Sequence, residues 1–391
     1  MTVGLFVGTR KGAFILRSKD RETWDLSGPI YLGHTANHVV CDPRDGRTVV
    51  IGSRGGHLGP TVYRSTDAGQ SWAEARLPPR FQKSADGTVA DDPSGLRPDQ
   101  ILQVAPRRSV ANVFWLTPGH ASEPGVWYAG TSPHGLFRSE DGGDTWEGVD
   151  GFNENPKRLA WSNNDDPKFA PPGGAITHSV SVDPRDKNHL YLGLSTGGFF
   201  ESTDRGNDWS PLNRGCEAMF LPDPEAEFGH DPHSVRLAPS NPDRLYQQNH
   251  CGIYRLDRPA GRWSRVGEAM PKEVGDIGFS IEVHPRDADT AWVFPMDGTD
   301  VWPRTSPDAK PGVFVTRDGG TSWNRQRAGM PDRAWWTVYR QSVSVDRADP
   351  VGVYFGTSSG ELWASRDEGE SWRPIAEHLP AIVAVEAAEL A

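Results

Sequence analysis

A short motif recurs along the chain and constrains its fold more than any other feature. The five well-formed copies are "STDAGQSW" (65–72), "SEDGGDTW" (139–146), "STDRGNDW" (202–209), "TRDGGTSW" (316–323) and "SRDEGESW" (365–372). Two degenerate copies are "SKDRETW" (18–24), one residue short, and "RLDRPAGRW" (255–263), one residue long. Their tryptophans lie roughly 50–75 residues apart, a period typical of propellers and other repeat arrays.

The chemistry of the motif is structural. An Asp carboxylate can accept backbone N–H groups inside a tight turn, and the Gly two residues later can adopt a left-handed conformation. The Trp is expected to begin the next strand and to bury its ring between neighbouring sheets. The repeated Asp residues are therefore interpreted as turn residues and not as catalysts.

At these residues the chain resembles the Asp-box, or BNR, repeat proteins, which include sialidases, xyloglucanase-type glycosidases, sortilin-like receptors and photosystem assembly factors. The resemblance covers nearly the whole chain, and the motif reports fold rather than activity. Each motif lies in a unit of four short strands. The inner strand ends in a Pro-containing turn, as in "HSVSVDPRDKN" (178–188), the third runs into the box, and the fourth starts at its Trp.

The predicted fold is all-β, a seven-bladed β-propeller with Asp-box repeats that forms one domain over residues 1–391. The chain starts with "VGLFVGT" and "GAFILRS", which read as the second and third strands of a blade. It ends with "LPAIVAVEAA" (379–388), which reads as an inner strand. We expect the N- and C-terminal strands to complete one blade and to close the ring, which removes its free edge.

Composition narrows the class of protein. The 43 Gly and 33 Pro residues suit a turn-rich β protein. A formal net charge of −11 argues against nucleic acid as a partner, and three Cys cannot form a disulfide framework. The N-terminus lacks the pattern of a signal peptide, and no apolar run is long enough to span a membrane. A cytoplasmic location is expected.

The long insertions should all lie on one face of the propeller. They either enter an inner strand or join the second and third strands of a blade, at 74–110, 147–175, 210–231, 264–277, 296–311 and 324–339. The turns expected on the opposite face are short, as in "DPRDGR" and "DPRDKN". Long loops gathered on one side of a rigid scaffold commonly build a functional site, whereas drift in tolerated loops should use both faces.

Histidines point to a candidate site on that face. Alignment of the inner strands brings His178 and His233 into the ring of residues at the mouth of the central channel, and His250 falls in a turn on the same face. His178, His233 and His250 could bind a divalent metal such as Zn, Mn or Fe, or could form a metal-free acid/base site, with Asp231 as a further catalytic candidate. The alternative is that these histidines only bind loop backbones around the channel.

Further residues are expected to bind a small polar substrate on this face. Arginines can hold a carboxylate or phosphate through two hydrogen bonds, and an exposed Trp can stack against a sugar. The substrate-binding candidates are Arg54, Arg340, Asn249, Gln341, Asn37, Arg304, Asp300 and Trp336. Cys216 and Cys251 are interpreted as small buried residues.

Several segments are similar to those of one subgroup of the Asp-box proteins. "DPHS", "QQNHCGIYR", "GFSIEVHPRD" and "VYFGTSSGELWAS" resemble a subgroup of bacterial Asp-box proteins labelled sialidase-like or glycosyl hydrolase-like. The first hypothesis is a hydrolase- or lyase-like enzyme that acts on a glycan or sugar acid. One alternative is a non-catalytic scaffold that binds a protein partner. Another is a sialidase-type exo-glycosidase, which would be expected to have six blades, three arginines and an early Arg-Ile-Pro-like motif.

Overall fold

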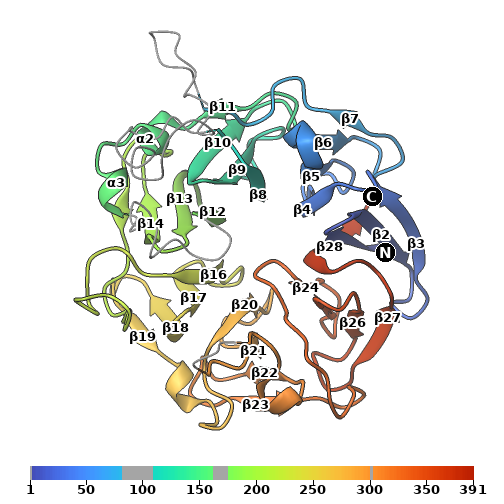
Figure 1. Ribbon diagram of the computed structural model, residues 1–391, viewed down its shortest axis with the longest axis vertical. Coiled ribbons are helices and arrows are strands. Elements are labelled where there is room, and N and C mark those ends of the chain that lie inside the picture. The colour runs from blue at the N-terminus through green and yellow to red at the C-terminus, as the bar shows by residue number, and fades with distance from the viewer. Residues whose placement is uncertain (1, 82–108, 162–174, 300–302) are drawn as a thin grey trace.

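The chain forms a ring of antiparallel sheets around a central axis (Figure 1). The structure is a computed structural model that describes residues 2–81, 109–161, 175–299 and 303–391. Seven four-stranded sheets, or blades, are present in this described part of the chain. The predicted all-β, seven-bladed propeller is therefore confirmed, and the seven blades differ from the six that a sialidase would require.

The blades are numbered along the chain, and the strands of each blade are given from the innermost to the outermost. Blade 1 consists of β28 (Ile382–Leu390), β1 (Thr2–Thr9), β2 (Gly12–Ser18) and β3 (Asp25–Ile30). Blade 2 consists of β4 (Thr35–Cys41), β5 (Val49–Gly55), β6 (Gly59–Ser65) and β7 (Ala73–Glu74). Blade 3 consists of β8 (Asn112–Pro118), β9 (Trp127–Ser132), β10 (Gly135–Ser139) and β11 (Glu147–Gly148). Blade 4 consists of β12 (Thr177–Asp183), β13 (Asp186–Leu194), β14 (Gly198–Ser202) and β15 (Ser210–Pro211).

The other three blades repeat the same order. Blade 5 consists of β16 (Pro232–Leu237), β17 (Arg244–Asn249), β18 (Gly252–Asp257) and β19 (Trp263–Arg265). Blade 6 consists of β20 (Gly278–Val283), β21 (Ala291–Pro295), β22 (Val313–Thr316) and β23 (Asn324–Gln326). Blade 7 consists of β24 (Val343–Val345), β25 (Val353–Gly356), β26 (Leu362–Ser365) and β27 (Arg373–Ala376).

Helical segments are short and lie in the connections. They are α2 (Asp150–Asn153), α3 (Arg158–Trp161), η1 (Gly56–Leu58), η4 (Gly267–Ala269) and η5 (Pro307–Ala309). In the described part of the chain, no helix has both the length and the apolar character that crossing a membrane requires.

The ring closes between the two ends of the chain, as the sequence predicts. β28 pairs antiparallel with β1, so that Leu5 faces Ala387 and Val7 faces Val385. The innermost strand of blade 1 thus comes from the C-terminus, and the other three strands come from the N-terminus (Figure 1). The pairing satisfies the inner edge of β1, which would otherwise expose unpaired N–H and C=O groups.

The repeated motif forms the predicted turn between the third and fourth strands. In one copy, Asp67 accepts the backbone N–H groups of Gln70 and Ser71 at 3.0 and 2.8 Å. The hydroxyl of Ser65 donates to the same carboxylate at 2.7 Å and accepts the N–H of Gly69 at 2.8 Å. Gly69 has a φ of 86°, which confirms the left-handed position expected two residues after the Asp.

The motif tryptophans are distributed evenly over the core. The described hydrophobic core consists of seven clusters, each shared by two neighbouring blades. Every cluster contains or contacts one tryptophan of the motif, namely Trp24, Trp72, Trp146, Trp209, Trp263, Trp323 and Trp372. Each ring lies against the preceding blade, so the repeat supplies one large aromatic group to every interface of the ring.

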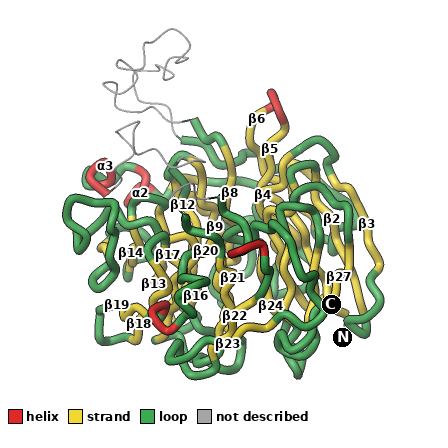
Figure 2. Tube along the Cα trace, turned by 60° about the horizontal axis from the view of Figure 1, so that its bottom comes forward, coloured by secondary structure: helices red, strands yellow, loops and turns green. Residues whose placement is uncertain are grey.

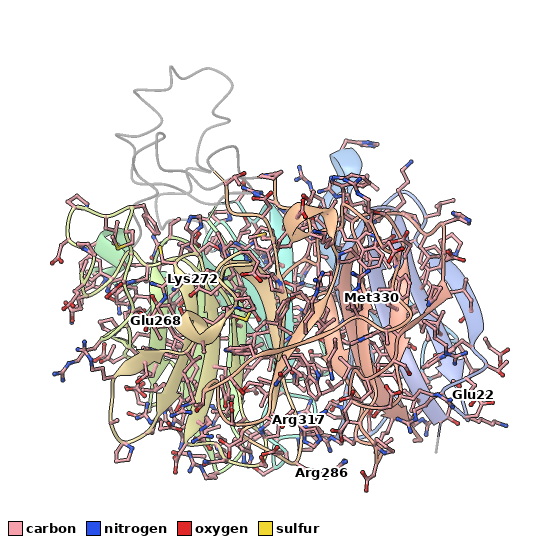
Figure 3. All side chains as sticks on the ribbon, turned by 90° about the horizontal axis from the view of Figure 1, so that it is seen from below. Glu22, Glu268, Lys272, Arg286, Arg317 and Met330 are labelled. Atoms are coloured by element: carbon pink, nitrogen blue, oxygen red, sulfur yellow. The ribbon has the colours of Figure 1, made fainter. Side chains whose placement is uncertain are left out.

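The two ends of the ring carry different kinds of connection. The motif turns and the turns after the inner strands share one end, where Glu22, Arg286 and Arg317 are seen in Figure 3, whereas Lys272, in the segment before β20, lies nearer the other end. The turns between second and third strands open at this other end, where η1 projects beyond β5 and β6 (Figure 2). We call this end the loop face.

Removal of residues 382–391 should destroy cooperative folding, because it deletes the inner strand of blade 1 and frees the edge of β1. Thermal unfolding followed by circular dichroism checks this, with removal of Ala391 alone as the control. A truncated chain that melts as cooperatively as the full chain would show that the ring does not depend on this closure.

The Asp141→Ala variant should lower the free energy of unfolding by about 1–3 kcal/mol at pH 7, because the carboxylate accepts the N–H groups of Asp144 and Thr145 and the hydroxyl of Ser139. Asp332→Ala is the control, because that side chain is fully exposed. Both are measured by denaturant unfolding.

The loss in the Asp141→Ala variant should also depend on pH. Although burial opposes it, hydrogen bonding within the motif lowers the pKa of this carboxyl. A carboxyl with a lowered pKa in the folded state stabilises the fold above its unfolded pKa of about 3.9 and loses that effect as the pH falls toward the folded value. The difference in stability between the wild-type protein and the variant should therefore shrink below about pH 4, and a constant difference would contradict this account.

Candidate functional site

Three polar side chains of blade 5 meet at the start of its inner strand. His233 Nε2 lies 3.3 Å from Asp231 Oδ2, and His250 Nδ1 lies 3.7 Å from the same oxygen. Asp231 directly precedes β16 and His233 lies within it, where the pairing with β17 is irregular between Pro232 and Ser234. His250 lies in the β17–β18 turn, and its backbone N–H donates to the carbonyl of Asp231 at 2.9 Å. We call Asp231, His233 and His250 the blade 5 cluster.

Neighbouring blades hold the cluster in place. His233 Nδ1 lies 2.6 Å from the carbonyl oxygen of Gly278 in blade 6. Asp231 Oδ1 accepts the backbone N–H of Thr196 in blade 4 at 3.1 Å. Both side chains are almost completely buried, whereas the His250 side chain is 30% exposed. His250 is therefore the member of the cluster that an incoming molecule can reach.

Residues 249–251 lead from β17 into β18 and shape the turn that carries His250. Asn249 is fully buried, donates to Gln247 Oε1 at 2.6 Å and accepts the N–H of Cys251 at 3.1 Å. It therefore shapes the turn that presents His250, and its predicted role in substrate binding is corrected to a structural one. Burial raises the pKa of the thiols of Cys216 and Cys251, so both stay protonated at neutral pH.

Two arginines lie beside the cluster. The guanidinium carbons of Arg340 and Arg304 lie 5.1 and 5.8 Å from the ring centre of Phe279, whose ring is 4.9 Å from that of His233. Arg340 Nη2 is 3.5 Å from the hydroxyl of Ser195, and its buried Nε has no hydrogen-bond partner among the described residues. Because a guanidinium offers several donors in one plane, this group is suited to a carboxylate or phosphate.

The charges of the site act on one another. Burial alone would raise the pKa of Asp231, but His233, Arg340 and His250 hold it below its usual value. Burial and the neighbouring His233 lower the pKa of His250. Burial and Arg304 lower the pKa of Arg340, although Asp231 opposes this. The carboxylate is thus ionised and the His250 imidazole neutral near pH 7.

Of the predicted trio, His233 and His250 belong to the blade 5 cluster, and His178 lies beside it: burial and the charge of Arg340 lower the pKa of His178, whereas the charge of Asp231 raises it. His178 is fully buried, and its Nδ1 lies 2.8 Å from the hydroxyl of Ser179. Ser179 has a φ of 50°, and the pairing of β12 with β13 is irregular between His178 and Ser181. The inner strand of blade 5 has a similar irregularity between Pro232 and Ser234. Asp231 takes the place of His178, and the ligand atoms of the blade 5 cluster all lie within 4.8 Å of one another.

Asn37 and Gln341, which were predicted to bind substrate, each form hydrogen bonds within the protein through the amide nitrogen of the side chain. Asn37 Nδ2 donates to the carbonyl of Val113 at 3.2 Å. Gln341 Nε2 donates to the carbonyls of Asn37 and Phe114 at 2.7 and 3.0 Å. Since these acceptors belong to blades 2 and 3, the side chain of Gln341 links blade 7 to the far side of the ring and fixes the segment that carries Arg340.

Two other predicted binding residues are not part of this group. Arg54 is exposed on β5, and β5 lies across the ring from β16 (Figure 1). No hydrogen bond or ion pair joins Arg54 to the blade 5 cluster within the described ranges. Asp300 lies outside the described residues.

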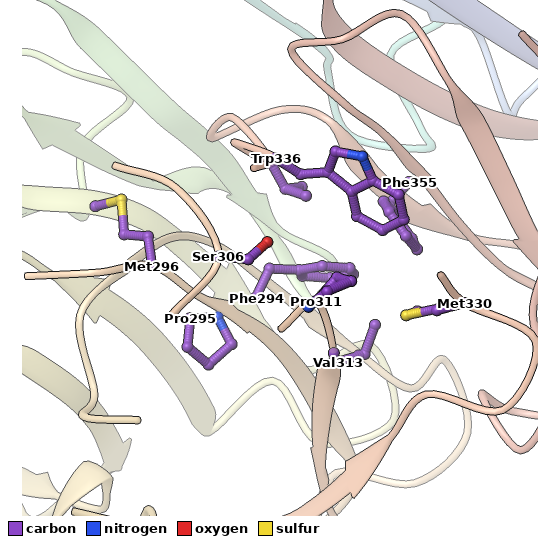
Figure 4. A pocket seen from close by; sticks show the side chains of 11 residues that line it. Phe294, Pro295, Met296, Ser306, Pro311, Val313, Met330, Trp336 and Phe355 are labelled. Atoms are coloured by element: carbon purple, nitrogen blue, oxygen red, sulfur yellow. The ribbon is translucent and has the colours of Figure 1, made fainter. Parts of the chain in front are cut away.

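Trp336 was expected to stack against a substrate, but it is a core residue. It is only 6% exposed and packs against Phe355 and Trp363 with ring centres 6.0 and 5.1 Å away. It lines a cavity of about 20 Å³ between blades 6 and 7, which is too small for a sugar (Figure 4). The neighbouring Trp335 is 61% exposed, and the guanidinium of Arg333 lies over its ring. The alternation of the chain thus places Trp335 on the surface and Trp336 inside.

The curated proteins that match the sequence are xyloglucanases. No family model matches the chain. The oligoxyloglucan-reducing end-specific xyloglucanase of Emericella nidulans is 25% identical over 224 residues, 52% of this chain and 24% of that protein. The xyloglucanase of a Paenibacillus species is 27% identical over 364 residues, 88% of this chain and 26% of that protein. The chain thus spans about a quarter of the length of these curated relatives.

The solved structures agree on the fold. The GH74 xyloglucanase from Xanthomonas campestris superposes with a TM-score of 0.64 at 17% identity, over 95% of this chain and 52% of that chain. This protein is therefore a seven-bladed β-propeller with xyloglucanase homologues.

The two adjacent tryptophans provide a matched test of which ring is buried in the core and which is exposed. Trp336→Ala should lower the free energy of unfolding by about 3–5 kcal/mol, because it empties part of the core between blades 6 and 7. Trp335→Ala should change it by no more than about 0.5 kcal/mol, because its ring faces solvent. Denaturant unfolding measures both, and equal losses would contradict the assignment of one ring to the core and the other to the surface.

Proposed function

We propose that this chain is a carbohydrate-acting hydrolase whose site is the blade 5 cluster together with Arg304 and Arg340. The observation that carries the proposal is the meeting of one carboxylate and two imidazoles beside two guanidiniums on the loop face. Such groups can activate a water molecule and hold an anion. The similarity to xyloglucanases supports a carbohydrate substrate.

The charges favour an anionic sugar derivative. Arg340 has an unpartnered, buried Nε that can bind a carboxylate, and Trp335 offers an exposed aromatic ring for a sugar on the same face. We therefore propose a sugar acid, or a sugar lactone that keeps a free carboxylate, as the substrate class.

The exposure of each residue in the blade 5 cluster suggests its role in the reaction. His250 reaches solvent and meets the substrate, whereas Asp231 and His233 are buried and orient the reacting groups. The cluster contains a single carboxylate, while glycoside hydrolysis of the usual kind uses a pair. For this reason hydrolysis of such a lactone is placed ahead of glycoside cleavage.

A substrate screen with a charge-removing variant tests the proposal. The purified protein is assayed against sugar lactones that keep a free carboxylate, uronic-acid glycosides and neutral aryl glycosides. Arg340→Met should lower kcat/KM for the anionic substrates by roughly 10–100-fold, as expected from the loss of a charged hydrogen bond, and should spare neutral ones. Arg54→Met is the control, because Arg54 is an exposed arginine on the opposite side of the ring. No turnover of any substrate class, or equal losses for charged and neutral substrates, would contradict the proposal.

A second candidate is a non-catalytic scaffold that binds a protein partner on the loop face. Large apolar side chains are exposed in the loops of this face, at Leu32, Leu58, Met219 and Trp335, with exposures of 61–75%. Exposed apolar groups that gather on one face are typical of binding surfaces. A scaffold predicts no turnover, and loss of partner binding in a Leu58→Ser, Met219→Ser variant with an unchanged Tm.

A further inference from the structure

The separations within the blade 5 cluster match those of atoms that share a metal ion. His233 Nε2 and Asp231 Oδ2 are 3.3 Å apart, and His250 Nδ1 is 3.7 Å from the same oxygen. Ligands that each lie about 2.0–2.1 Å from a tetrahedral zinc ion are separated by about 3.3–3.4 Å. Since all three ligand atoms lie within 4.8 Å of one another, rotation of the partly exposed His250 side chain could bring them around one cation.

The hydrogen bond of His233 to Gly278 leaves its other ring nitrogen directed at the carboxylate of Asp231. Its Nδ1 lies 2.6 Å from the carbonyl oxygen of Gly278, and a carbonyl can only accept a hydrogen bond, so Nδ1 carries a proton. In the neutral imidazole, Nε2 then has a lone pair that faces the Asp231 carboxylate. In this tautomer Nε2 has the geometry of a metal ligand beside a carboxylate ligand.

The hydrogen bonds that orient Asp231 and His233 resemble those around the ligands of known metal sites. A histidine ligand commonly donates its second ring N–H to a backbone carbonyl, as His233 does to Gly278. The carboxylate is oriented in the same way, by the N–H of Thr196 at 3.1 Å. Both contacts come from neighbouring blades, so the closed ring would hold the ligands in position before the ion binds.

We propose that Asp231, His233 and His250 bind one divalent transition-metal ion, of the class Zn²⁺, Mn²⁺ or Fe²⁺, and leave coordination positions open toward the loop face. Imidazole and carboxylate ligands suit these ions, and three protein ligands leave room for water and substrate. Bound water would then be the nucleophile, and Arg340 and Arg304 would hold the anionic group of a substrate beside the ion. The inference deepens the proposed function but is tested without a substrate.

Metal binding to the full chain tests the proposal. After dialysis against a chelator, the protein is titrated with Zn²⁺, Mn²⁺ and Fe²⁺ separately by calorimetry, the iron under anaerobic conditions, and the bound metal is counted by elemental analysis. We expect one ion per chain and a Tm that rises with metal concentration. Asp231→Asn and His250→Ala should weaken binding by at least about 100-fold, more than the 10–100-fold typical of residues that only orient a ligand.

His57→Ala is the control variant, and Asp231→Asn distinguishes a bound metal ion from a proton shared by Asp231 and His233. His57→Ala removes an exposed histidine of η1 in blade 2 and should leave the affinity unchanged. Asp231→Asn keeps the shape of the side chain, so an unchanged Tm of the metal-free variant shows that the fold is intact. Absence of stoichiometric binding, or equal binding by wild type and Asp231→Asn, would overturn the proposal and would mean that a proton lies between Asp231 and His233. Hydrolysis that persists in the chelated protein would leave the proposed function standing without the metal.

Discussion

The structure depends on the packing of each blade against the next. A single blade has two apolar faces and cannot bury both, so stability comes from interfaces that the ring repeats until it closes. The motif tryptophans serve this need, because each lies in a different inter-blade cluster. The pairing of β28 with β1 completes the last blade, so that blade 1 can pack against blade 7 as well as blade 2.

The closed ring also builds the candidate site. Blade 5 supplies Asp231, His233 and His250, but blade 4 positions the carboxylate and blade 6 positions one imidazole. Blade 7 contributes Arg340, and Gln341 anchors that segment across the ring. A site assembled from four blades is rigid only if the ring is rigid, which is why packing far from the cluster bears on its chemistry.

Sequence reasoning found the fold for physical reasons. Strand order fixes which turns share a face, and for this reason the sequence predicts that His178, His233 and His250 lie on the same face. It did not predict that the ligand atoms of Asp231, rather than those of His178, lie closest to His233 and His250, because that depends on local backbone geometry at the start of each inner strand. It also chose Trp336 over Trp335, since nothing in an irregular loop tells which of two adjacent rings faces the core.

The sequence by itself determined the repeat, the number of blades, the closure and the face that carries the long loops, because these follow from local turn chemistry and from chain order. Tertiary structure alone decided which polar groups meet. Distances between blades depend on bulges, on the packing of seven interfaces and on hydrogen bonds such as that from Gln341 across the ring. Such contacts join residues that are far apart in the chain, and no local pattern encodes their separation.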